Sequence, residues 1–234
     1  QELDNWCRQT KWPHHVDSVD ATDKACLQRV QLLAEGGWLR WCVPREYGGK
    51  HESLDVRSLC LIRETLARYD ALADFSFAMQ GLGSGAISLY GNPEQKQNIL
   101  EEVSTGRMIA GFALSEPDAG SDVAAMNSKA FSTTEGWKVN GEKSWISNGG
   151  IADYYTLFAK TSDQPGSGGI STFLLKADNP GLSIAERQEV MASHPLARLQ
   201  LKDAELSPEA LLGEEGKGFR IAMATLNIFR PTVG

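Results

Sequence analysis

The sequence lacks any apolar run that approaches the roughly 20 residues needed to cross a bilayer. It also has no charged-then-apolar leader at its start, so we expect a soluble protein. Positive charge is scarce, since 23 Lys and Arg stand against 30 Asp and Glu and leave a net charge of −7. This balance provides no basic stripe to neutralise nucleic acid phosphates. We therefore expect neither a nucleic acid nor a membrane among the partners.

Cysteine and histidine are also scarce. The four cysteines are Cys7, Cys26, Cys42 and Cys60. They form no CxxC pair and have no metal-ligand spacing, so we predict free thiols, a reducing cytoplasmic location and no metal site. The histidines are scattered, and the pair His14-His15 beside Pro13 is interpreted as a solvated surface pair.

The composition is that of an ordinary globular protein, with 234 residues of which 41% are hydrophobic. The chain opens on Gln1 rather than Met and stops at Gly234 while an amphipathic stretch is still running. We interpret it as a piece of a longer polypeptide.

Helical spacing dominates from about Asp20 to Val103, where apolar residues recur at intervals of three and four. One such stripe consists of Leu59, Ile62, Leu66 and Tyr69. Asn92-Pro93-Glu94 predicts a helix start, because Asn caps free amides and Pro is tolerated in the first turn. We expect that helix to end near Gly106.

Two glycine-rich segments also occur in this helical half of the sequence. The segment 43–49 contains Pro and paired Gly and predicts a loop between helices. The segment 81–85, Gly-Leu-Gly-Ser-Gly, resembles a dinucleotide-binding fingerprint, but no strand pattern precedes it. Close helix packing is the better interpretation of those glycines.

After Arg107 the pattern changes to short extended runs rich in β-branched and aromatic residues. The predicted strands are 108–114, 138–140, 154–160, 170–176 and 182–187. Glu135-Gly136 and Asn140-Gly141 predict hairpin turns, and 163–169 predicts an exposed loop. Beyond Gly213 a helix is expected with Phe219, Met223 and Leu226 on one face.

The resulting fold class is α+β. We expect an N-terminal all-helical domain at 1–107, an antiparallel β-barrel or sheet domain at 108–213, and the start of a C-terminal helical bundle at 214–234.

Two stretches carry candidate chemistry. The first, 112–122, is Phe-Ala-Leu-Ser-Glu-Pro-Asp-Ala-Gly-Ser-Asp, a strand followed by a loop that exposes amides and hydroxyls to a polar ligand edge. The second, 142–150, is Glu-Lys-Ser-Trp-Ile-Ser-Asn-Gly-Gly, in which Trp145 and Ser147 are expected on one face and suit a planar heterocycle. Taken alone, the first stretch is more typical of an ordinary turn. The tryptophan of the second stretch, taken alone, is more typical of a core residue.

Together, the two stretches resemble the acyl-CoA dehydrogenase family, whose patterns are Leu-Ser/Thr-Glu-Pro-x-Ala-Gly-Ser-Asp and Lys-x-Trp-Ile-Ser/Thr-Asn-Gly. The resemblance extends through 90–96 and 216–223 and covers the chain from about Trp38 onward. It implies a helical domain, a middle β-domain and a C-terminal helical bundle, with FAD and an acyl-CoA thioester held between them.

By resemblance, one loop and one strand contact the flavin. The cofactor-binding residues implied are Phe112, Leu114, Ser115, Gly120, Ser121, Trp145, Ile146 and Ser147. Ser115 is expected near the pyrimidine edge of the ring, while Trp145 and Ser147 cover the other flank and reach toward N5. Ser121, Asn227 and Arg230 match substrate-side positions, although a helix-end salt bridge would explain Arg230 equally well.

The family reaction removes the α-proton of an acyl-CoA with a Glu carboxylate and passes the β-hydrogen to the flavin as hydride. We expect that base in the absent C-terminal region, so no catalytic residue is assigned here. Phe229 occupies the alternative position of the base and cannot accept a proton. We reject Glu116, because an acid before Pro at a strand end more often anchors a loop by accepting backbone amides.

The resemblance implies an oxidoreductase of fatty acid metabolism that passes its electrons to an electron-transfer flavoprotein and assembles as a homotetramer or homodimer. Two alternatives stay open. An acyl-CoA oxidase or related flavin monooxygenase shares the fold, and a non-catalytic flavin-binding relative would retain both motifs. The length and branching of the acyl chain are not encoded in this part of the sequence.

Overall fold

The computed structural model describes residues 1–13 and 18–233, so the predicted surface pair His14-His15 lies outside the described residues. Six α-helices are described: α1 (Glu2–Gln9), α2 (Val19–Glu35), α3 (Val56–Tyr69), α4 (Ala71–Tyr90), α5 (Pro93–Ser104) and α6 (Gly218–Phe229). Five short 3-10 helices are also described: η1 (Leu39–Trp41), η2 (Arg45–Tyr47), η3 (Val123–Ala125), η4 (Pro208–Ala210) and η5 (Arg230–Val233).

The predicted helical pattern of this half is confirmed, although Tyr69, the fourth residue of the predicted stripe, is only half-buried. Leu59, Ile62 and Leu66 form the buried stripe of α3. At the start of α5, the Asn92 side chain accepts from the Gln95 backbone N–H, while the Gln95 side chain accepts from the Asn92 N–H. This reciprocal capping satisfies two amides that the first helical turn leaves free.

The glycines of 81–85 lie inside α4 and serve close packing, as predicted. A Cβ on Gly81 would lie 2.6 Å from the Phe229 ring, and one on Gly85 would lie 2.8 Å from the same ring. A Cβ on Gly83 would lie 2.5 Å from that of Ala110 in the neighbouring strand. Glycine therefore lets α4 approach α6 on one side and the sheet on the other.

The described residues form one mixed sheet of seven strands. They are β1 (Ala110–Ala113), β2 (Lys129–Thr133), β3 (Gly136–Ser147), β4 (Tyr154–Lys160), β5 (Ile170–Lys176), β6 (Leu182–Arg187) and β7 (Leu196–Leu206). The order is β1-β4-β2-β3-β7-β6, and β5 pairs with β4. The expected class is confirmed, but the antiparallel description needs correction: β1–β4 and β2–β4 are parallel.

Several strand boundaries differ from the sequence predictions. β2 was missed because it has only two apolar residues, among Lys, Ser and Thr, and β7 was missed because Arg, Lys, Asp and Glu interrupt its apolar pattern. The hairpin near Glu135-Gly136 exists between β2 and β3. Asn140-Gly141 is not a turn: Gly141 lies within β3 beside a register shift against β7, where a Cβ would meet the Ser128 side chain at 2.2 Å.

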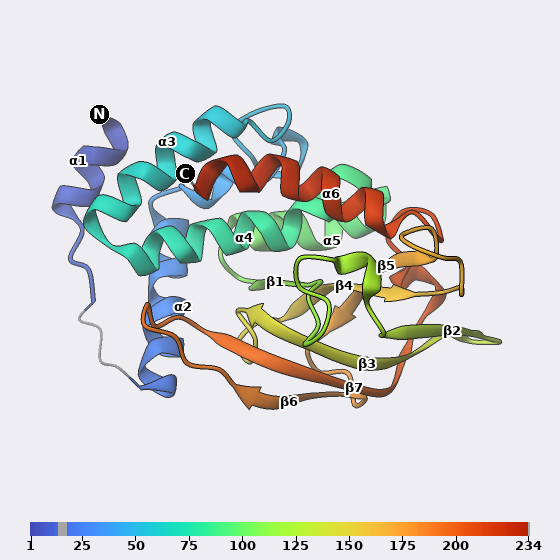
Figure 1. Cartoon of the computed structure of the whole chain (residues 1–234). Coiled ribbons are helices and arrows are strands. Elements are labelled where there is room, and N and C mark those ends of the chain that lie inside the picture. The colour runs from blue at the N-terminus through green and yellow to red at the C-terminus, as the bar shows by residue number, and fades with distance from the viewer. Residues whose placement is uncertain (14–17, 234) are drawn as a thin grey trace.

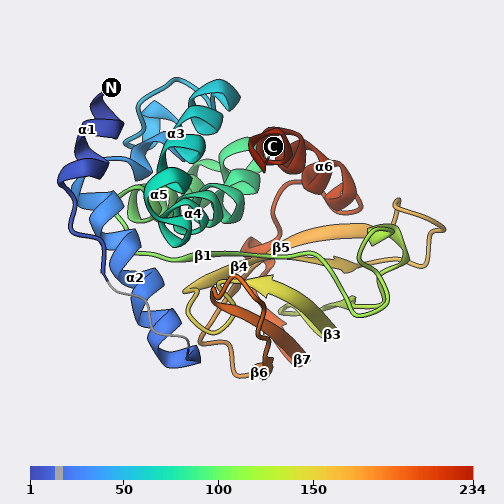
Figure 2. The same ribbon diagram turned by 60° about the vertical axis from the view of Figure 1, so that its left-hand side comes forward.

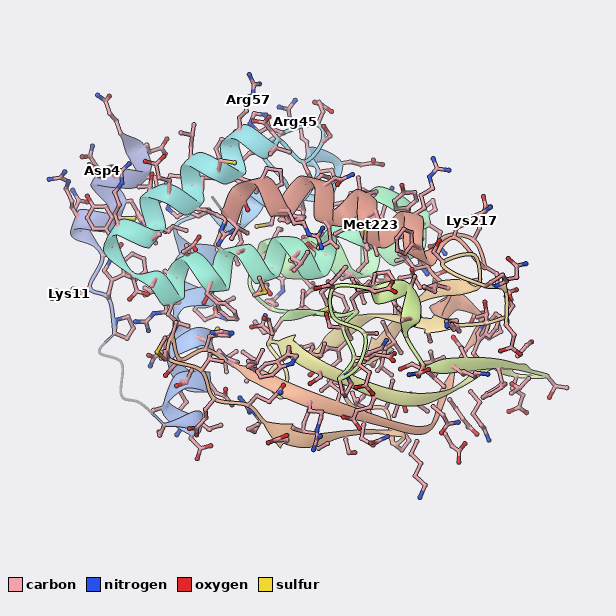
Figure 3. The ribbon with its side chains drawn as sticks, viewed as in Figure 1. Asp4, Lys11, Arg45, Arg57, Lys217 and Met223 are labelled. Carbon is pink, nitrogen blue, oxygen red and sulfur yellow. The ribbon has the colours of Figure 1, made fainter. Side chains whose placement is uncertain are left out.

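Helices α3, α4, α5 and α6 form a layer over the sheet, while α2 runs along its side (Figures 1 and 2). Buried residues from the helices and from the sheet belong to one continuous hydrophobic cluster. Lys217 precedes α6 and Met223 lies along it (Figure 3). The helix beyond Gly213 is confirmed, and the three residues expected on one of its faces pack against the hydrophobic core. Phe219, Met223 and Leu226 are half-buried. The buried positions of α6 are Gly218, Ile221, Ala222, Thr225 and Phe229.

The four cysteines are free, as predicted, and three of them are buried. Burial raises the pKa of the Cys7 thiol to about 11 and that of Cys26 to about 12, and it also raises the pKa of Cys42. Since the thiolate is the nucleophile, these buried thiols are chemically inert at neutral pH. Within the described residues, no helix is long and apolar enough to span a membrane.

We predict that Gly81→Ala and Gly83→Ala each lower the free energy of unfolding by about 1–3 kcal/mol, as overpacking does. Alanine's better helix propensity, about 1 kcal/mol, opposes this loss. Urea unfolding measures the result.

Phe229→Leu provides the matched control. It should relieve part of the Gly81→Ala penalty, which arises against the Phe229 ring, and none of the Gly83→Ala penalty, which arises at Ala110. Equal relief at both positions, or an alanine variant more stable than the parent, would contradict the packing described here.

Candidate functional site

The first motif is the loop that follows β1. Glu116 and Ala119 exchange backbone hydrogen bonds of 3.1 and 3.2 Å, which close a tight turn over Pro117 and Asp118. Beyond this turn Gly120 and Ser121 are exposed, and a Cβ on Gly120 would meet nothing within 4 Å. The backbone at Gly120 therefore borders open space, and the Ser121 side chain is accessible beside it.

Glu116 fixes the two ends of this loop. Its carboxylate accepts from the backbone N–H groups of Asn127 at 2.5 Å and Ser128 at 3.1 Å. The side chain is only 5% exposed. The prediction that Glu116 anchors the loop by accepting backbone amides is therefore confirmed.

The second motif is the end of β3, and the fold places it directly beside the first. The Ser144 backbone N–H donates to the Ser115 carbonyl at 3.0 Å. Lys143 donates from its Nζ to the Leu114 carbonyl at 3.2 Å and to Glu116 Oε1 at 2.8 Å. Segments 27 or more residues apart in the sequence thus share one hydrogen-bonded junction.

The Lys143–Glu116 ion pair is buried, with side chains 0% and 5% exposed. Burial alone would raise the pKa of the Glu116 carboxyl, but the Lys143 ammonium and the Asn127 amide outweigh it and hold that pKa below its ordinary value. Burial lowers the pKa of Lys143, and Glu116 opposes this. Both groups stay charged only while each has the other, so the pair is a rigid structural link.

Trp145 is the most unusual residue of the site. Its indole is 58% exposed, whereas large aromatic side chains are mostly buried. Its φ of 60° lies in the left-handed region, which costs a side-chain-bearing residue about 1–2 kcal/mol. The residue sits in the register shift between Lys143 and Ile146, and its N–H donates to Gln188 Oε1 at 2.9 Å.

Asn148 directly follows β3 and forms hydrogen bonds with β1 and with the segment before β7. Its side-chain amide donates to the Ala110 carbonyl at 2.8 Å, and its backbone N–H donates to the Pro195 carbonyl at 2.9 Å. Its φ of 58° makes the turn that asparagine tolerates better than most residues. The second motif is thereby fixed to the start of β1 as well as to the loop that follows that strand.

The proposed flavin contacts fall into three groups. Gly120, Ser121 and Trp145 are exposed, while Ser115 and Ser147 are half-buried. Leu114 and Ile146 are buried, so they can support the exposed residues from below. Phe112 is half-buried and packs its ring on Phe158 with centroids 5.0 Å apart. The exposed and half-buried members suit a flat ring with a polar edge.

The substrate-side candidates lie on a different element. Asn227 is exposed on α6, and Arg230 is exposed immediately after it. Among the described residues Arg230 has no carboxylate partner, so the alternative of a helix-end salt bridge is not observed. Phe229 is buried against Gly81 and Gly85, and it serves as a core residue.

Two residues that form hydrogen bonds within the two motifs were not predicted from the sequence. Lys143 received no role although it belongs to the second motif, and the available signal was a lysine at an inward-facing strand position. Gln188 was not considered, because nothing in the local sequence connects it with Trp145, 43 residues away. Within the described residues, no group of three or more His, Cys, Asp and Glu side chains could hold a metal ion.

Known families account for most of the chain. The sequence profile described as "Acyl-CoA dehydrogenase, N-terminal domain" matches residues 2–107, and "Acyl-CoA dehydrogenase, middle domain" matches residues 111–204. A probable acyl-CoA dehydrogenase, fadE25, of Mycobacterium leprae is 35% identical over 224 residues, covering 95% of this chain and 57% of the relative. The chain thus spans little more than half the length of that relative.

Solved structures of acyl-CoA dehydrogenases are also similar to this chain. Butyryl-CoA dehydrogenase from Megasphaera elsdenii superposes with a TM-score of 0.84 at 29% identity, covering 99% of this chain and 62% of that one. An acyl-CoA dehydrogenase complexed with FAD from Bacillus anthracis superposes with a TM-score of 0.80 at 33% identity, covering 99% and 38%.

We predict that Glu116→Gln lowers the free energy of unfolding by about 3–5 kcal/mol, because it leaves the Lys143 charge buried without a partner. The double variant Glu116→Gln/Lys143→Met should recover most of this loss. As a control, Asp163→Asn breaks the Lys129–Asp163 pair, whose side chains are 47% and 89% exposed, and should change little. Similar losses of unfolding free energy in Glu116→Gln and Asp163→Asn would contradict a stabilising role for the buried Lys143–Glu116 pair.

The same pair predicts a pH dependence. Because the folded-state pKa of Glu116 lies below its unfolded value near 4.5, its contribution is present above pH 4.5 and is lost as the pH falls through the folded value. Between about pH 5 and 3, the parent should therefore lose more stability than the double variant.

Proposed function

This chain belongs to the acyl-CoA dehydrogenase family, and we propose that the protein is an FAD-dependent acyl-CoA dehydrogenase. The reaction would be the α,β-desaturation of an acyl-CoA thioester. The single observation that carries the proposal is the junction of the two motifs, where Ser115 bonds to Ser144 and the exposed Trp145 follows directly.

The residues at this junction fit a flavin. An exposed indole offers a flat apolar surface on which a planar ring stacks favourably. The neighbouring loop offers Ser115, the open backbone at Gly120 and the exposed Ser121 as polar groups for the edge of that ring. The Glu116 carboxylate is engaged by Lys143 and would not contact the ring.

Each residue then has a defined task. Trp145 and Ser147 would cover one flank of the isoalloxazine, and Ser115 with the loop amides would meet its pyrimidine edge. Phe112, Leu114 and Ile146 would support these contacts from beneath. Bound FAD supplies the acceptor for the hydride that the substrate loses, and the protein supplies position and electrostatics.

The substrate would lie between this surface and α6. We propose that Ser121, Asn227 and Arg230 contact the acyl-CoA thioester, and that the α-proton is removed by a carboxylate outside this chain. The domain division 1–107, 108–213 and 214–234 belongs to the same proposal. We also propose a homotetrameric or homodimeric assembly. The four free cysteines favour a cytoplasmic location, which we include in the same proposal.

Replacing Trp145 by Ala in the full-length protein should weaken FAD binding about tenfold or more, because the change removes a large stacking surface. The matched control is Phe131→Ala, which removes another exposed ring, 53% exposed on β2, that lies outside both motifs. Flavin fluorescence titration gives both affinities. Equal affinities for Trp145→Ala and the parent would refute the proposed flavin site.

The electron acceptor separates the dehydrogenase from its alternatives. We propose an electron-transfer flavoprotein as acceptor, so the reduced protein should react slowly with oxygen and quickly with such a partner. Oxygen consumption during turnover with an acyl-CoA, and no other acceptor, measures this. Rapid consumption would instead identify an acyl-CoA oxidase or a flavin monooxygenase.

A further inference from the structure

The backbone at Trp145 is strained by its positive φ of 60°, so neighbouring contacts must stabilise this conformation. A positive φ at a non-glycine, bulky residue is an outlier that persists only where its surroundings determine it, and such outliers cluster at functional sites. Because Trp145 lies in the register shift between Lys143 and Ile146, its N–H is offset from the pairing of β3 with β7. A partner from outside that ladder must accept its hydrogen bond.

Gln188 is that partner. It follows the last residue of β6, and its Oε1 accepts the Trp145 N–H at 2.9 Å. Its Nε2 lies 3.4 Å from the Ser144 hydroxyl, so one amide group contacts both residues of the shift. The side chain thus replaces the missing ladder bond at the strained position.

The position of Gln188 is itself fixed. Its backbone N–H donates to the Leu196 carbonyl at 2.9 Å. The preceding residue, Arg187, forms a two-pronged ion pair with Asp23 of α2, in which the side chains are 24% and 17% exposed. Arg187 also packs against Gly150, where a Cβ would lie 2.6 Å from its Nη1. The end of β6 therefore contacts both ends of the 145–150 segment.

We propose that Gln188 is a positioning residue: it holds the Trp145 backbone in the left-handed conformation that keeps the indole exposed toward the flavin. This inference rests on the proposed flavin site. Gln188 acts through Trp145 and has no contact of its own with the reacting atoms.

The test compares three variants of the full-length protein. Gln188→Met keeps the length of the side chain but removes the amide acceptor, while Gln188→Glu keeps an oxygen acceptor. Gln200→Met is the matched control. The Gln200 side chain also forms a hydrogen bond with the β3 backbone, donating to the Gly141 carbonyl at 2.9 Å, but it does so away from Trp145. Circular dichroism verifies that each variant is folded.

The first readout needs no flavin. In protein labelled with 5-fluorotryptophan, the ¹⁹F resonance of position 145 is assigned by its loss in Trp145→Phe. Gln188→Met should shift or broaden this resonance, whereas Gln188→Glu and Gln200→Met should leave it in place. An unchanged resonance in Gln188→Met would overturn the proposal.

The second readout is FAD affinity. Losing one net hydrogen bond predicts binding about 2- to 10-fold weaker in Gln188→Met, with parental affinity in Gln200→Met. A Gln200→Met loss as large as that of Gln188→Met would mean general destabilisation and would overturn the positioning role. If the parent binds no FAD, the proposed function fails, and the ¹⁹F result still decides the role of Gln188.

Discussion

The buried ion pair between Lys143 and Glu116 is the contact on which the rest of the site depends. It joins a loop that follows β1 to the end of β3, two segments that the sequence separates. Each of the two buried charges is stable only beside the other, so the pair keeps these two segments together. In that arrangement Gly120, Ser121 and Trp145 are exposed, and Ser115 is half-buried.

The surrounding fold holds this junction in place. Asn148 bonds the end of β3 to Ala110 at the start of β1, so the second motif touches that strand's beginning as well as the loop after its end. The glycines of α4 let that helix lie close to β1 and to α6 at once. The site is therefore built on packed elements rather than on a free loop, which suits a cofactor that must be held in one orientation.

Sequence patterns predicted the parts of this molecule that local chemistry determines. The capped start of α5 at Asn92, the packing role of the α4 glycines and the loop-anchoring role of Glu116 follow from neighbouring residues alone. What local patterns could not provide is pairing across the sheet. β7 was missed because charged residues interrupt its apolar alternation, and Gln188 because only the β6–β7–β3 pairing brings it to Trp145.

The central claim is that the loop after Leu114 and the indole of Trp145 border the same flat ligand. A crystal structure of the protein grown with FAD tests it most directly. The account predicts the isoalloxazine within van der Waals contact, about 4 Å, of the Trp145 indole and within hydrogen-bonding distance of the 115–121 loop. A flavin ring bound elsewhere, or one touching only one of these two segments, would contradict it.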